Sequence, residues 1–504
     1  MKTNKIKRRN FMKFMGLGMA AVGLAPSMLA AQDEGKKKNV LFIVSDDMNT
    51  RLGCYGDPVI QTPNIDALAK RGVRFDRAYC QYPVCNPSRA SFMTGLYVDQ
   101  VDVYDLHTDF RKAVPDVVTL PQHFKNNGYF TARSGKIYHQ GVPRDVGRSG
   151  LDDPQSWDEV RNPKGRDKTE ENKIFSFTPG KFGGTPSWRC IECEDDELTD
   201  GMVADDIIEM MEAHKDEPFF LAAGFYRPHT PYVAPKKYFD MHPLDKIEVA
   251  ETPPEGSPGN LAGKIDWKNQ DYIKRKSYER DFSDEDRKHI IQAYFASASH
   301  MDAQVGRLLD ALKRLGLEDD TVVIFIGDHG YSLGEHNHWM KSTIYETDAR
   351  APMIMGGPGI ERGGVCPAPV EFVDIYPTLA AACGLPVFDW LPGMDLAEQL
   401  VKPQTPTNQT ALTQARREYS YAIRDERYCL AAHWAPEGKW QWPDQPQYQM
   451  FDHKTDPKEW YNVIDDPEYA EVAERLKKQL ENHPGYKAEA PKTLAADTSG
   501  SEKR

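Results

Sequence analysis

The segment Cys85-Asn86-Pro87-Ser88-Arg89 places a thiol, a hydroxyl and a guanidinium within five residues. The thiolate form of cysteine is the nucleophile, and a neighbouring cation lowers the pKa of a thiol. We therefore expect Cys85 to have a lowered pKa and raised reactivity beside Arg89. The alternative is a structural role, in which Pro87 occupies the first turn of a helix, where its missing N–H costs nothing, and Arg89 is solvated.

Two acidic motifs follow apolar runs. Asp46-Asp47 comes directly after the run at residues 39–44, and Asp328-His329 comes after the run at residues 321–326. Adjacent carboxylates repel one another unless a cation neutralises them. Three carboxylates form a hard, oxygen-rich site that suits Ca²⁺ or Mg²⁺ better than Zn²⁺. Each pair alone could be a turn or a helix cap, but their joint placement with Cys85 favours a metal site.

Two further polar motifs lie in the same relation to apolar runs. Gly135-Lys136 follows the run at residues 129–132, and Arg227-Pro228-His229 follows the run at residues 218–225. Continuous apolar runs are typical of parallel strands buried on both faces. Open α/β sheets bind ligands beyond the carboxyl ends of their strands. The four motifs therefore predict one shared site at one edge of a sheet.

The alternation of apolar runs and helical patterns predicts an α/β fold with a large, mostly parallel sheet flanked by helices. The clearest helix is expected over residues 283–315, where Ser283 can act as the N-cap and acidic residues fill the first turn. A second helix is expected from residue 63 to residue 70. Residues 140–200 are polar and rich in glycine and proline, which indicates an insertion over the site, and residues 251–280 are similar.

The pattern changes after residue 400, which indicates a smaller C-terminal α+β subdomain. Strands are expected over residues 419–431 and 449–452, and an amphipathic helix over residues 471–480. We therefore divide the folded chain into a catalytic domain of residues 36–400 and a subdomain of residues 401–488. The polar tail at residues 489–504 is predicted to be disordered.

Residues 1–31 have the pattern of an export signal. A basic start precedes the apolar run at residues 14–25, and Arg8-Arg9 begins a twin-arginine-like motif. The run is short and rich in glycine and alanine, so an uncleaved membrane anchor is the less favoured alternative. The signal predicts a periplasmic or secreted protein, with no stable membrane association after the signal is removed.

Composition excludes some functions and leaves others open. The chain has 504 residues and a net charge of −13, so it lacks the general basic surface that nucleic-acid binding requires. An anionic substrate would need a local cationic pocket. Eight cysteines are too few for a disulfide scaffold. Cys190 and Cys193 could form a local disulfide or remain as free thiols.

The segment that starts at Cys85 continues to Thr94-Gly95 and resembles the signature C-x-P-S-R-x-x-x-x-T-G of the type I sulfatases. The further motifs fit the same family in order: Asp46-Asp47, Gly135-Lys136-Ile137-Tyr138-His139, Arg227-Pro228-His229-Thr230-Pro231, Gly327-Asp328-His329-Gly330 and Lys341. The resemblance is closest to the iduronate-2-sulfatase branch and covers nearly the whole mature chain. It implies an alkaline-phosphatase-like sandwich with a smaller C-terminal subdomain.

The resemblance also implies a role for each residue. Cys85 would be oxidised after translation to formylglycine, the catalytic aldehyde, and Arg89 would hold this nucleophile. One Ca²⁺ per subunit would be bound by the modified residue 85 and by side chains at four positions: Asp46, Asp47, Asp328 and His329. Lys136 would hold the formylglycine or a sulfate oxygen, and Lys341 would bind sulfate. His139 would take a proton from the hydrated aldehyde during sulfate release, and His229 would protonate the leaving alcohol.

The reaction implied by the resemblance is hydrolysis of sulfate esters. The expected substrate is a sulfated saccharide, such as a uronate 2-O-sulfate unit of a glycosaminoglycan or algal polysaccharide. The uronate carboxylate would need a cationic partner, for which Arg111, Arg227 and Arg350 are candidates. The required partner protein is a formylglycine-generating enzyme or an anaerobic sulfatase-maturating enzyme. The alternatives are a phosphonate or phosphate ester hydrolase on the same scaffold and a non-catalytic carbohydrate-binding relative.

Overall fold

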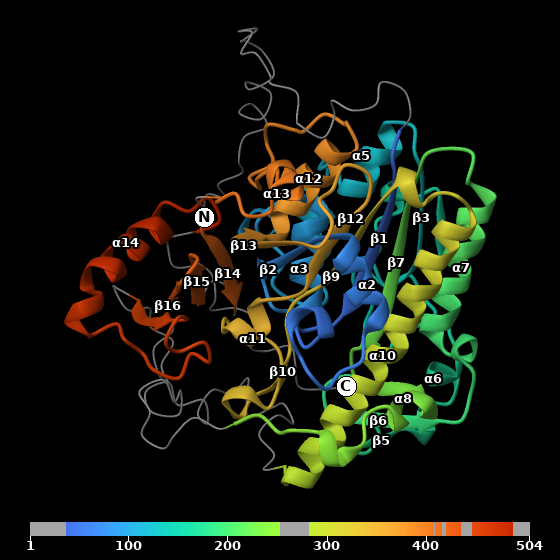
Figure 1. The fold of residues 1–504 in the computed structure, drawn as a ribbon, viewed down its shortest axis with the longest axis horizontal. Coiled ribbons are helices and arrows are strands. Elements are labelled where there is room, and N and C mark those ends of the chain that lie inside the picture. Colours follow the sequence, from blue (N-terminus) through green and yellow to red (C-terminus); the bar gives the residue numbers. More distant parts are fainter. Residues whose placement is uncertain (1–36, 252–281, 408, 416–419, 435–445, 487–504) are drawn as a thin grey trace, which may run out of the picture.

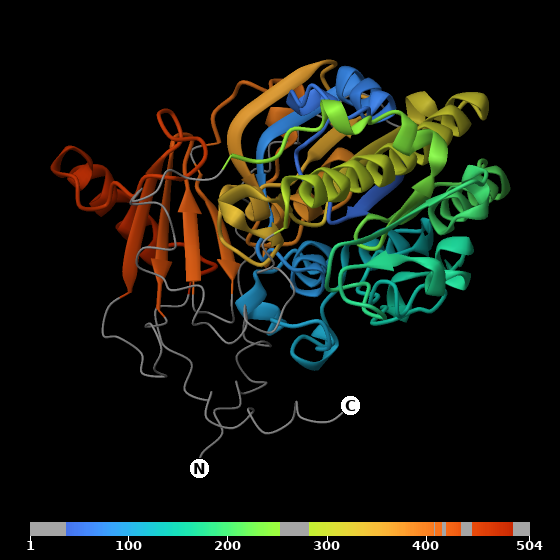
Figure 2. The ribbon, with the colours of Figure 1, turned by 90° about the horizontal axis from the view of Figure 1, so that it is seen from below.

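The computed structural model describes residues 37–251, 282–407, 409–415, 420–434 and 446–486. A large sheet with helices on both faces forms the main body, and a smaller sheet stands beside it (Figures 1 and 2). The predicted signal at residues 1–31, most of the polar region at residues 251–280 and the predicted tail at residues 489–504 lie outside the described residues. No helix in the described part of the chain is both long enough and apolar enough to span a bilayer.

The large sheet has eight strands. Their order across the sheet is β13 (Gly364–Glu371), β2 (Gly72–Tyr79), β12 (Met353–Gly356), β9 (Thr321–Gly327), β1 (Asn39–Asp46), β7 (Phe219–Pro228), β3 (Phe130–Gly135) and β4 (Glu159–Arg161). Strand β12 is antiparallel to both of its neighbours, and the remaining seven strands run in one direction. The predicted α/β fold with a mostly parallel sheet is therefore confirmed.

Alternate side chains of the strands form two separate cores. On β1, Leu41 and Ile43 face one core, and Val40, Phe42 and Val44 face the other. The longer helices that contribute side chains to the first core are α2 (Pro63–Arg71), α7 (Thr199–Ala213) and α10 (Asp284–Arg314). The second core includes side chains of α3 (Cys85–Thr94), α5 (Leu120–Asn126), α12 (Ile375–Ala382) and α13 (Ala397–Val401). The sheet is thus covered on both faces, which explains the continuous apolar runs of its strands.

The helix expected over residues 283–315 is α10. Ser283 is its N-cap: the hydroxyl accepts a hydrogen bond from the backbone N–H of Asp286 at 3.1 Å, and the Asp286 carboxylate accepts from the N–H of Ser283 at 3.2 Å. This reciprocal pair satisfies donors that the first turn would otherwise leave free. The helix ends before Gly316, which adopts a left-handed conformation with φ of 69°.

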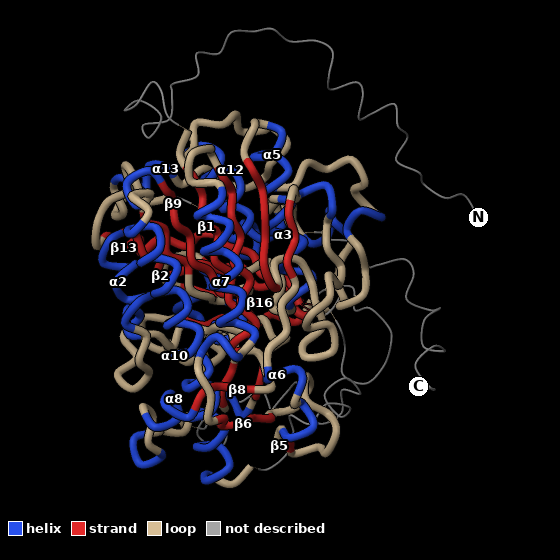
Figure 3. Tube along the Cα trace, turned by 90° about the vertical axis from the view of Figure 1, so that its right-hand side faces the viewer, coloured by secondary structure: helices blue, strands red, loops and turns tan. Residues whose placement is uncertain are grey.

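The region at residues 140–200 is more than an insertion. Its strand β4 pairs with β3 at the edge of the large sheet, so the prediction of an insertion over the site is wrong for this strand. Strands β5 (Phe175–Ser176) and β6 (Ser187–Ile191) join β8 (Tyr232–Pro235) in a separate three-stranded sheet (Figure 3). Because β8 begins three residues after His229, this part of the region flanks a predicted site residue.

The C-terminal subdomain is an antiparallel sheet with one packed helix. Its strands are β14 (Ala411–Ala415), β15 (Ser420–Arg424), β16 (Tyr428–His433) and β17 (Gln447–Asp452), and α14 (Ala470–Glu481) contributes Leu476 to their core. The prediction of a single strand over residues 419–431 is wrong, because β15 and β16 are two strands joined by a turn. The Asp425 carboxylate accepts hydrogen bonds from the N–H groups of Arg427 and Tyr428, which closes a hairpin turn. The boundary at residue 400 stays a prediction.

Four further α-helices of the described residues are short. They are α4 (Val98–Val101), α6 (Arg166–Thr169), α8 (Lys236–Asp240) and α11 (Glu346–Ala349). A two-stranded ribbon of β10 (Ser332–Leu333) and β11 (Trp339–Met340) leads to Lys341. All eight cysteines are free thiols, so Cys190 and Cys193 form no disulfide.

Candidate active site

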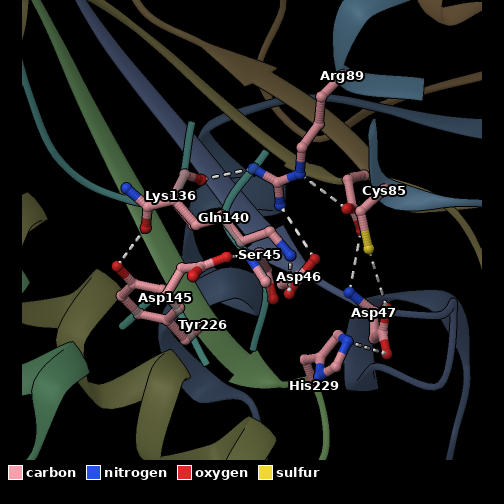
Figure 4. A network of polar contacts seen from close by, with 12 residues as sticks. Ser45, Asp46, Asp47, Cys85, Arg89, Lys136, Gln140, Asp145, Tyr226 and His229 are labelled. Atoms are coloured by element: carbon pink, nitrogen blue, oxygen red, sulfur yellow. Dashed lines mark hydrogen bonds and ion pairs between the residues drawn. The ribbon is translucent and has the colours of Figure 1, made fainter. Parts of the chain in front are cut away.

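The polar motifs meet where the central parallel strands end (Figure 4). Cys85 is the first residue of α3 and is 2% exposed. Its Sγ lies 3.9 Å from Oδ1 of Asp47, 3.5 Å from Nε2 of His329 and 3.0 Å from Nζ of Lys341. Residues separated by more than 250 positions thus converge on one sulfur atom. The prediction of one shared site at the strand ends agrees with this arrangement.

The backbone at Asp47 is strained and firmly held. Its φ is 63°, a left-handed conformation that few non-glycine residues adopt. The N–H of Asp47 donates to Oδ1 of Asp328 at 3.0 Å, and its carbonyl accepts from the Tyr294 hydroxyl at 2.8 Å. Such strain persists where the surroundings over-determine it, as they do at active sites. The turn directs the Asp47 carboxylate towards Cys85.

Arg89 is fully buried and binds carboxylates, not the thiol. Its Nε lies 2.9 Å from Oδ2 of Asp328, and its Nη2 lies 3.3 Å from Oδ1 of Asp46. Its Nη1 donates to the carbonyls of Lys136 and Ile137 at 2.5 and 2.9 Å. One guanidinium therefore joins three strand ends, and this use of all its groups is what offsets the cost of burying the charge.

The Cys85 thiol has a raised pKa, which corrects the expectation from sequence. Burial is the main cause, and the Asp46 carboxylate adds to it; Lys136 and Lys341 oppose the shift without reversing it. The sequence argument failed because the cation of Arg89 is already neutralised by two carboxylates, whereas the thiol is removed from water. The unmodified thiol is therefore a poor nucleophile at neutral pH.

Lys136 is placed by a close approach of two strands. Gly135 has φ of 74°, and a Cβ on Gly224 would lie 2.3 Å from the carbonyl carbon of Lys136. The Nζ of Lys136 lies 2.6 Å from Oδ2 of Asp46. Although burial alone would raise the pKa of Asp46, Lys136 and then His229 and Arg89 hold it well below its usual value. Asp46 is thus ionised.

The carboxylate of Asp47 is less well neutralised by neighbouring cations than that of Asp46. Burial raises its pKa, Lys341 opposes the shift, and the neighbouring charge of Asp46 adds to it. Lys341 donates to Oδ1 of Asp47, but Oδ2 accepts no hydrogen bond from the described residues. Burial disfavours the ammonium of Lys341, yet Asp47 and then Cys85 raise its pKa well above the usual value. The site therefore holds a carboxylate oxygen that still needs a positive partner.

His329 supplies a lone pair to the same cluster. Its Nδ1 lies 2.8 Å from the Gly330 carbonyl and so carries the proton. Burial lowers the pKa of His329, and the neutral ring presents the lone pair of Nε2 at 3.4 Å from Oδ1 of Asp47 and 3.5 Å from Oδ1 of Asp328. A lone pair that faces carboxylate oxygens is repelled unless a cation lies between them. The donor set therefore fits a bound cation.

The two predicted catalytic histidines are buried and neutral. Nδ1 of His229 donates to the Thr230 carbonyl at 2.5 Å, so the neutral ring has no proton on Nε2, which lies 3.7 Å from Oδ2 of Asp47. Burial lowers the pKa of His229 to about 3. Burial, reinforced by Lys136, also lowers the pKa of His139, whose ring nitrogens bind none of the described residues. His139 is thus free to accept a proton.

The candidate partners of a uronate carboxylate are largely engaged elsewhere. Arg227 forms a buried ion pair with Asp167 at 2.6 Å, and Arg111 forms a partly buried one with Asp153 at 2.8 Å. The guanidinium of Arg350 lies over the Tyr55 ring at 5.9 Å. The first two arginines therefore support the fold and are not available as ligands for a substrate.

Two supporting residues were not found from the sequence. The Asp200 carboxylate accepts from the N–H groups of Tyr226 and Arg227 at 2.8 and 3.0 Å, and so holds the end of β7. Asp348 accepts from the N–H of Thr343 at 2.9 Å in the Lys341 segment. Both are single aspartates without a local motif, so only their long-range contacts distinguish them.

The comparisons with known proteins identify the family. The family described as "Sulfatase" matches residues 38–385, and the one described as "N-sulphoglucosamine sulphohydrolase, C-terminal" matches residues 334–484. The first match covers most of the chain, so the chain belongs to the sulfatase family and is a sulfuric ester hydrolase. The family that the motifs predicted is confirmed.

Its relatives cover most of its length. A sulfatase of Formosa agariphila is 32% identical over 458 residues, which are 89% of this chain and 87% of the relative. Human iduronate 2-sulfatase is 33% identical over 413 residues, 74% of each chain. The choline-sulfatase of Rhizobium meliloti is 30% identical over 86% of this chain and 83% of its own.

Solved structures share the fold. The structure of a protein in complex with its substrate D-glucosamine-2-N,6-O-disulfate has a TM-score of 0.68 at 21% identity and covers 90% of this chain and 100% of that chain. A phosphonate monoester hydrolase of Agrobacterium radiobacter has a TM-score of 0.71 at 22% identity, with coverages of 89% and 96%. The predicted sandwich with a smaller C-terminal sheet is thereby confirmed.

Proposed function

We propose that this sulfuric ester hydrolase removes sulfate from a saccharide with a formylglycine made from Cys85 and with one bound Ca²⁺ per subunit. The observation that carries the proposal is the environment of Cys85. Its thiol is buried, has a raised pKa and lies within 4 Å of Asp47, His329 and Lys341. A thiol in this position is poorly nucleophilic, so a central nucleophile here requires chemical conversion.

The carboxylates and His329 would hold the calcium ion. Asp46, Asp47, Asp328 and the modified residue 85 offer oxygen ligands, which Ca²⁺ prefers, and the lone pair of His329 completes the set. The Oδ2 of Asp47, which accepts no hydrogen bond from the part of the chain that the structure describes, supports a cation at this position. When bound, the ion would supply positive charge that neutralises the sulfuryl oxygens and favours ionisation of the nucleophile.

Formylglycine would supply, as its hydrate, one hydroxyl to attack sulfur and a second hydroxyl whose ionisation allows sulfate to leave. Lys341 brings an ammonium group to this position, since its Nζ lies 3.0 Å from Sγ of Cys85, and the ammonium of Lys136 lies beside it on Asp46. Fixed cations that meet the charge developing on the sulfuryl oxygens lower the barrier because they need no reorganisation. Arg89 acts indirectly, by fixing Asp46 and Asp328.

The two histidines would move the protons. His139 is buried, neutral and without a described partner, so it is suited to remove the proton from the second hydroxyl. His229 has a pKa of about 3 in the substrate-free site, so its role as the acid depends on the substrate. A bound sulfate ester places a negative charge beside the ring and raises its pKa. Lys341 carries a proton in either state and can share this role.

The relatives support a sulfated saccharide as the substrate. One is an iduronate 2-sulfatase, another is an ulvan-active sulfatase, and a structural neighbour was solved with a disulfated glucosamine. We therefore retain a uronate 2-O-sulfate unit of a glycosaminoglycan or algal polysaccharide as the proposed substrate. The twin-arginine-like start of the chain supports export of the folded protein to the periplasm or the medium, after conversion of Cys85 by a formylglycine-generating or anaerobic maturating enzyme.

The test is release of free sulfate from a panel of sulfated saccharides, with Cys85→Ala as the matched control. We expect release from at least one uronate 2-O-sulfate and none from the variant. Equal release by the variant would refute the role of Cys85. Turnover of phosphonate monoesters without sulfate release would replace the proposal with the phosphonate ester hydrolase alternative.

A further inference from the structure

The segment that carries Lys341 is strained on both sides of the lysine. Met340 has φ of 81° and Ser342 has φ of 95°, both in the left-handed region that favours glycine. Such conformations persist only where the surrounding structure over-determines them. Because the ammonium of Lys341 contacts both Asp47 and Cys85, whatever holds this segment also sets the geometry of the site.

One set of contacts comes from the catalytic domain. The Asp348 carboxylate accepts from the N–H and the hydroxyl of Thr343 at 2.9 and 2.8 Å, and its other oxygen accepts from the Ser332 hydroxyl at 2.6 Å. Nε2 of His338 lies 3.2 Å from the Lys341 carbonyl. These contacts between neighbouring residues stabilise the turn after Lys341.

A second set comes from the C-terminal subdomain. Arg424, the last residue of β15, is 0% exposed and donates through Nη2 to the Ile344 carbonyl. Its Nε lies 3.2 Å from Oε2 of Glu346, and its guanidinium lies 5.0 Å from the centre of the Tyr79 ring. Glu459 accepts from the N–H of Glu346 at 2.8 Å. The subdomain thus binds the chain at Ile344 and Glu346, three to five residues after Lys341.

We propose that Arg424 is a positioning residue, through which the C-terminal subdomain holds the segment 342–346 and fixes the ammonium of Lys341 at residue 85. The claim rests on the proposed role of Lys341. A planar guanidinium can donate to the Ile344 carbonyl and to Glu346 at once, in a fixed relative direction. Without it, the strain at Met340 and Ser342 can relax and carry Lys341 away from the nucleophile.

The test compares Arg424→Met with Leu476→Ala, each alone and in a Lys341→Ala background. Leu476 lies in the core between α14 and the C-terminal sheet, so its truncation weakens the same subdomain without touching the Lys341 segment. At a temperature where circular dichroism shows each protein folded, we expect Arg424→Met to lower kcat about 10- to 100-fold with a smaller change in KM. Leu476→Ala should stay close to the parent enzyme.

The double variants separate positioning from general stability. If Arg424 acts through Lys341, Arg424→Met should cause no further loss of kcat once Lys341 is alanine. An equal fold-loss in both backgrounds, or a loss in Leu476→Ala that matches that in Arg424→Met, would overturn the proposal.

Chemical labelling gives a readout that needs no catalysis. Acetylation of lysines by a soluble acylating reagent, followed by peptide mass spectrometry, should show Lys341 protected in the parent protein and in Leu476→Ala. In Arg424→Met its labelling should rise several-fold, and unchanged labelling would overturn the proposal. If Lys341→Ala keeps full activity, the catalytic role of Lys341 fails, and the labelling then decides whether Arg424 positions it.

Discussion

Replacement of Asp167 by asparagine tests how the region at residues 140–200 supports the proposed acid. The Asp167 carboxylate lies 2.6 Å from Nη2 of Arg227, and both side chains are only 4% exposed. The Nη1 of Arg227 donates to the carbonyl of His229 at 3.1 Å. The ion pair therefore connects α6 with the backbone that presents the His229 ring.

The size of the effect follows from the burial of the pair. Removing one partner of a buried ion pair typically destabilises a protein by about 3–5 kcal/mol, because the remaining charge is left uncompensated. Asparagine can still accept from the N–H and hydroxyl of Thr199, which Asp167 binds at 2.9 and 2.6 Å. We therefore expect Asp167→Asn to lose about 3 kcal/mol of stability, the lower end of this range. We also expect kcat to fall about 10-fold as His229 shifts.

The assay is urea unfolding followed by fluorescence, together with steady-state sulfate release below the unfolding transition. Glu209→Gln is the matched control, because it removes a partner of Arg161 at the exposed edge of the same region. It should change neither stability nor kcat appreciably. A destabilised Asp167→Asn enzyme with an unchanged kcat would refute the connection to His229, and an unchanged stability would refute the reasoning about the buried pair.

Two further predictions concern calcium and pH. Removal of Ca²⁺ with a chelator should abolish sulfate release and lower the melting temperature. Addition of Ca²⁺ at 100 times its Kd should restore about 2.7 kcal/mol of stability, measured by calorimetry. Full activity in the chelated enzyme would contradict the proposed metal site. Burial alone would lower the pKa of His453, but the hydrogen bond to Glu459 raises it above its usual value. Burial alone would raise the pKa of Glu459, but His453 lowers it to about 2. The stabilisation from charged His453 is complete below about pH 6.5 and is lost as the pH rises through its raised pKa. The melting temperature of the parent should therefore fall on the alkaline side, and that of His453→Gln should fall less. Parallel curves of melting temperature against pH would contradict this assignment.

The positions of the site motifs could be predicted because the apolar runs are unambiguous. Strands β1, β9 and β7 are nearly continuous apolar segments, β3 begins with a shorter one, and parallel strands end at one edge of a sheet. Polar residues that follow such runs therefore had to meet. The order of the motifs then pointed to the family, which the comparisons confirmed.

The electrostatics of the site could not be predicted in the same way. The sequence shows Arg89 four residues from Cys85, but only the fold reveals that Asp46 and Asp328 neutralise it and that the thiol is buried. The protonation of His229 is likewise set by burial and by the carbonyl of Thr230. These effects arise from segments distant in sequence, which local patterns do not encode.

The C-terminal subdomain illustrates a second limit. Its residues 420–433 form one long β-prone stretch, and the turn within it depends on hydrogen bonds from Asp425 to its own backbone neighbourhood. The role of Arg424 was invisible because its partners Ile344 and Glu346 lie about 80 residues earlier. Strand pairing and buried ion pairs across subdomains require the three-dimensional structure.

The central claim is that the nucleophile is made from Cys85, and a titration of activity against conversion tests it most directly. Preparations made with and without a co-expressed formylglycine-generating enzyme would be analysed by peptide mass spectrometry across residue 85 and by sulfate release from a sulfated saccharide. The account predicts that activity per molecule rises in proportion to the fraction of formylglycine and vanishes where that fraction is zero. Undiminished activity in protein that retains the Cys85 thiol would contradict it.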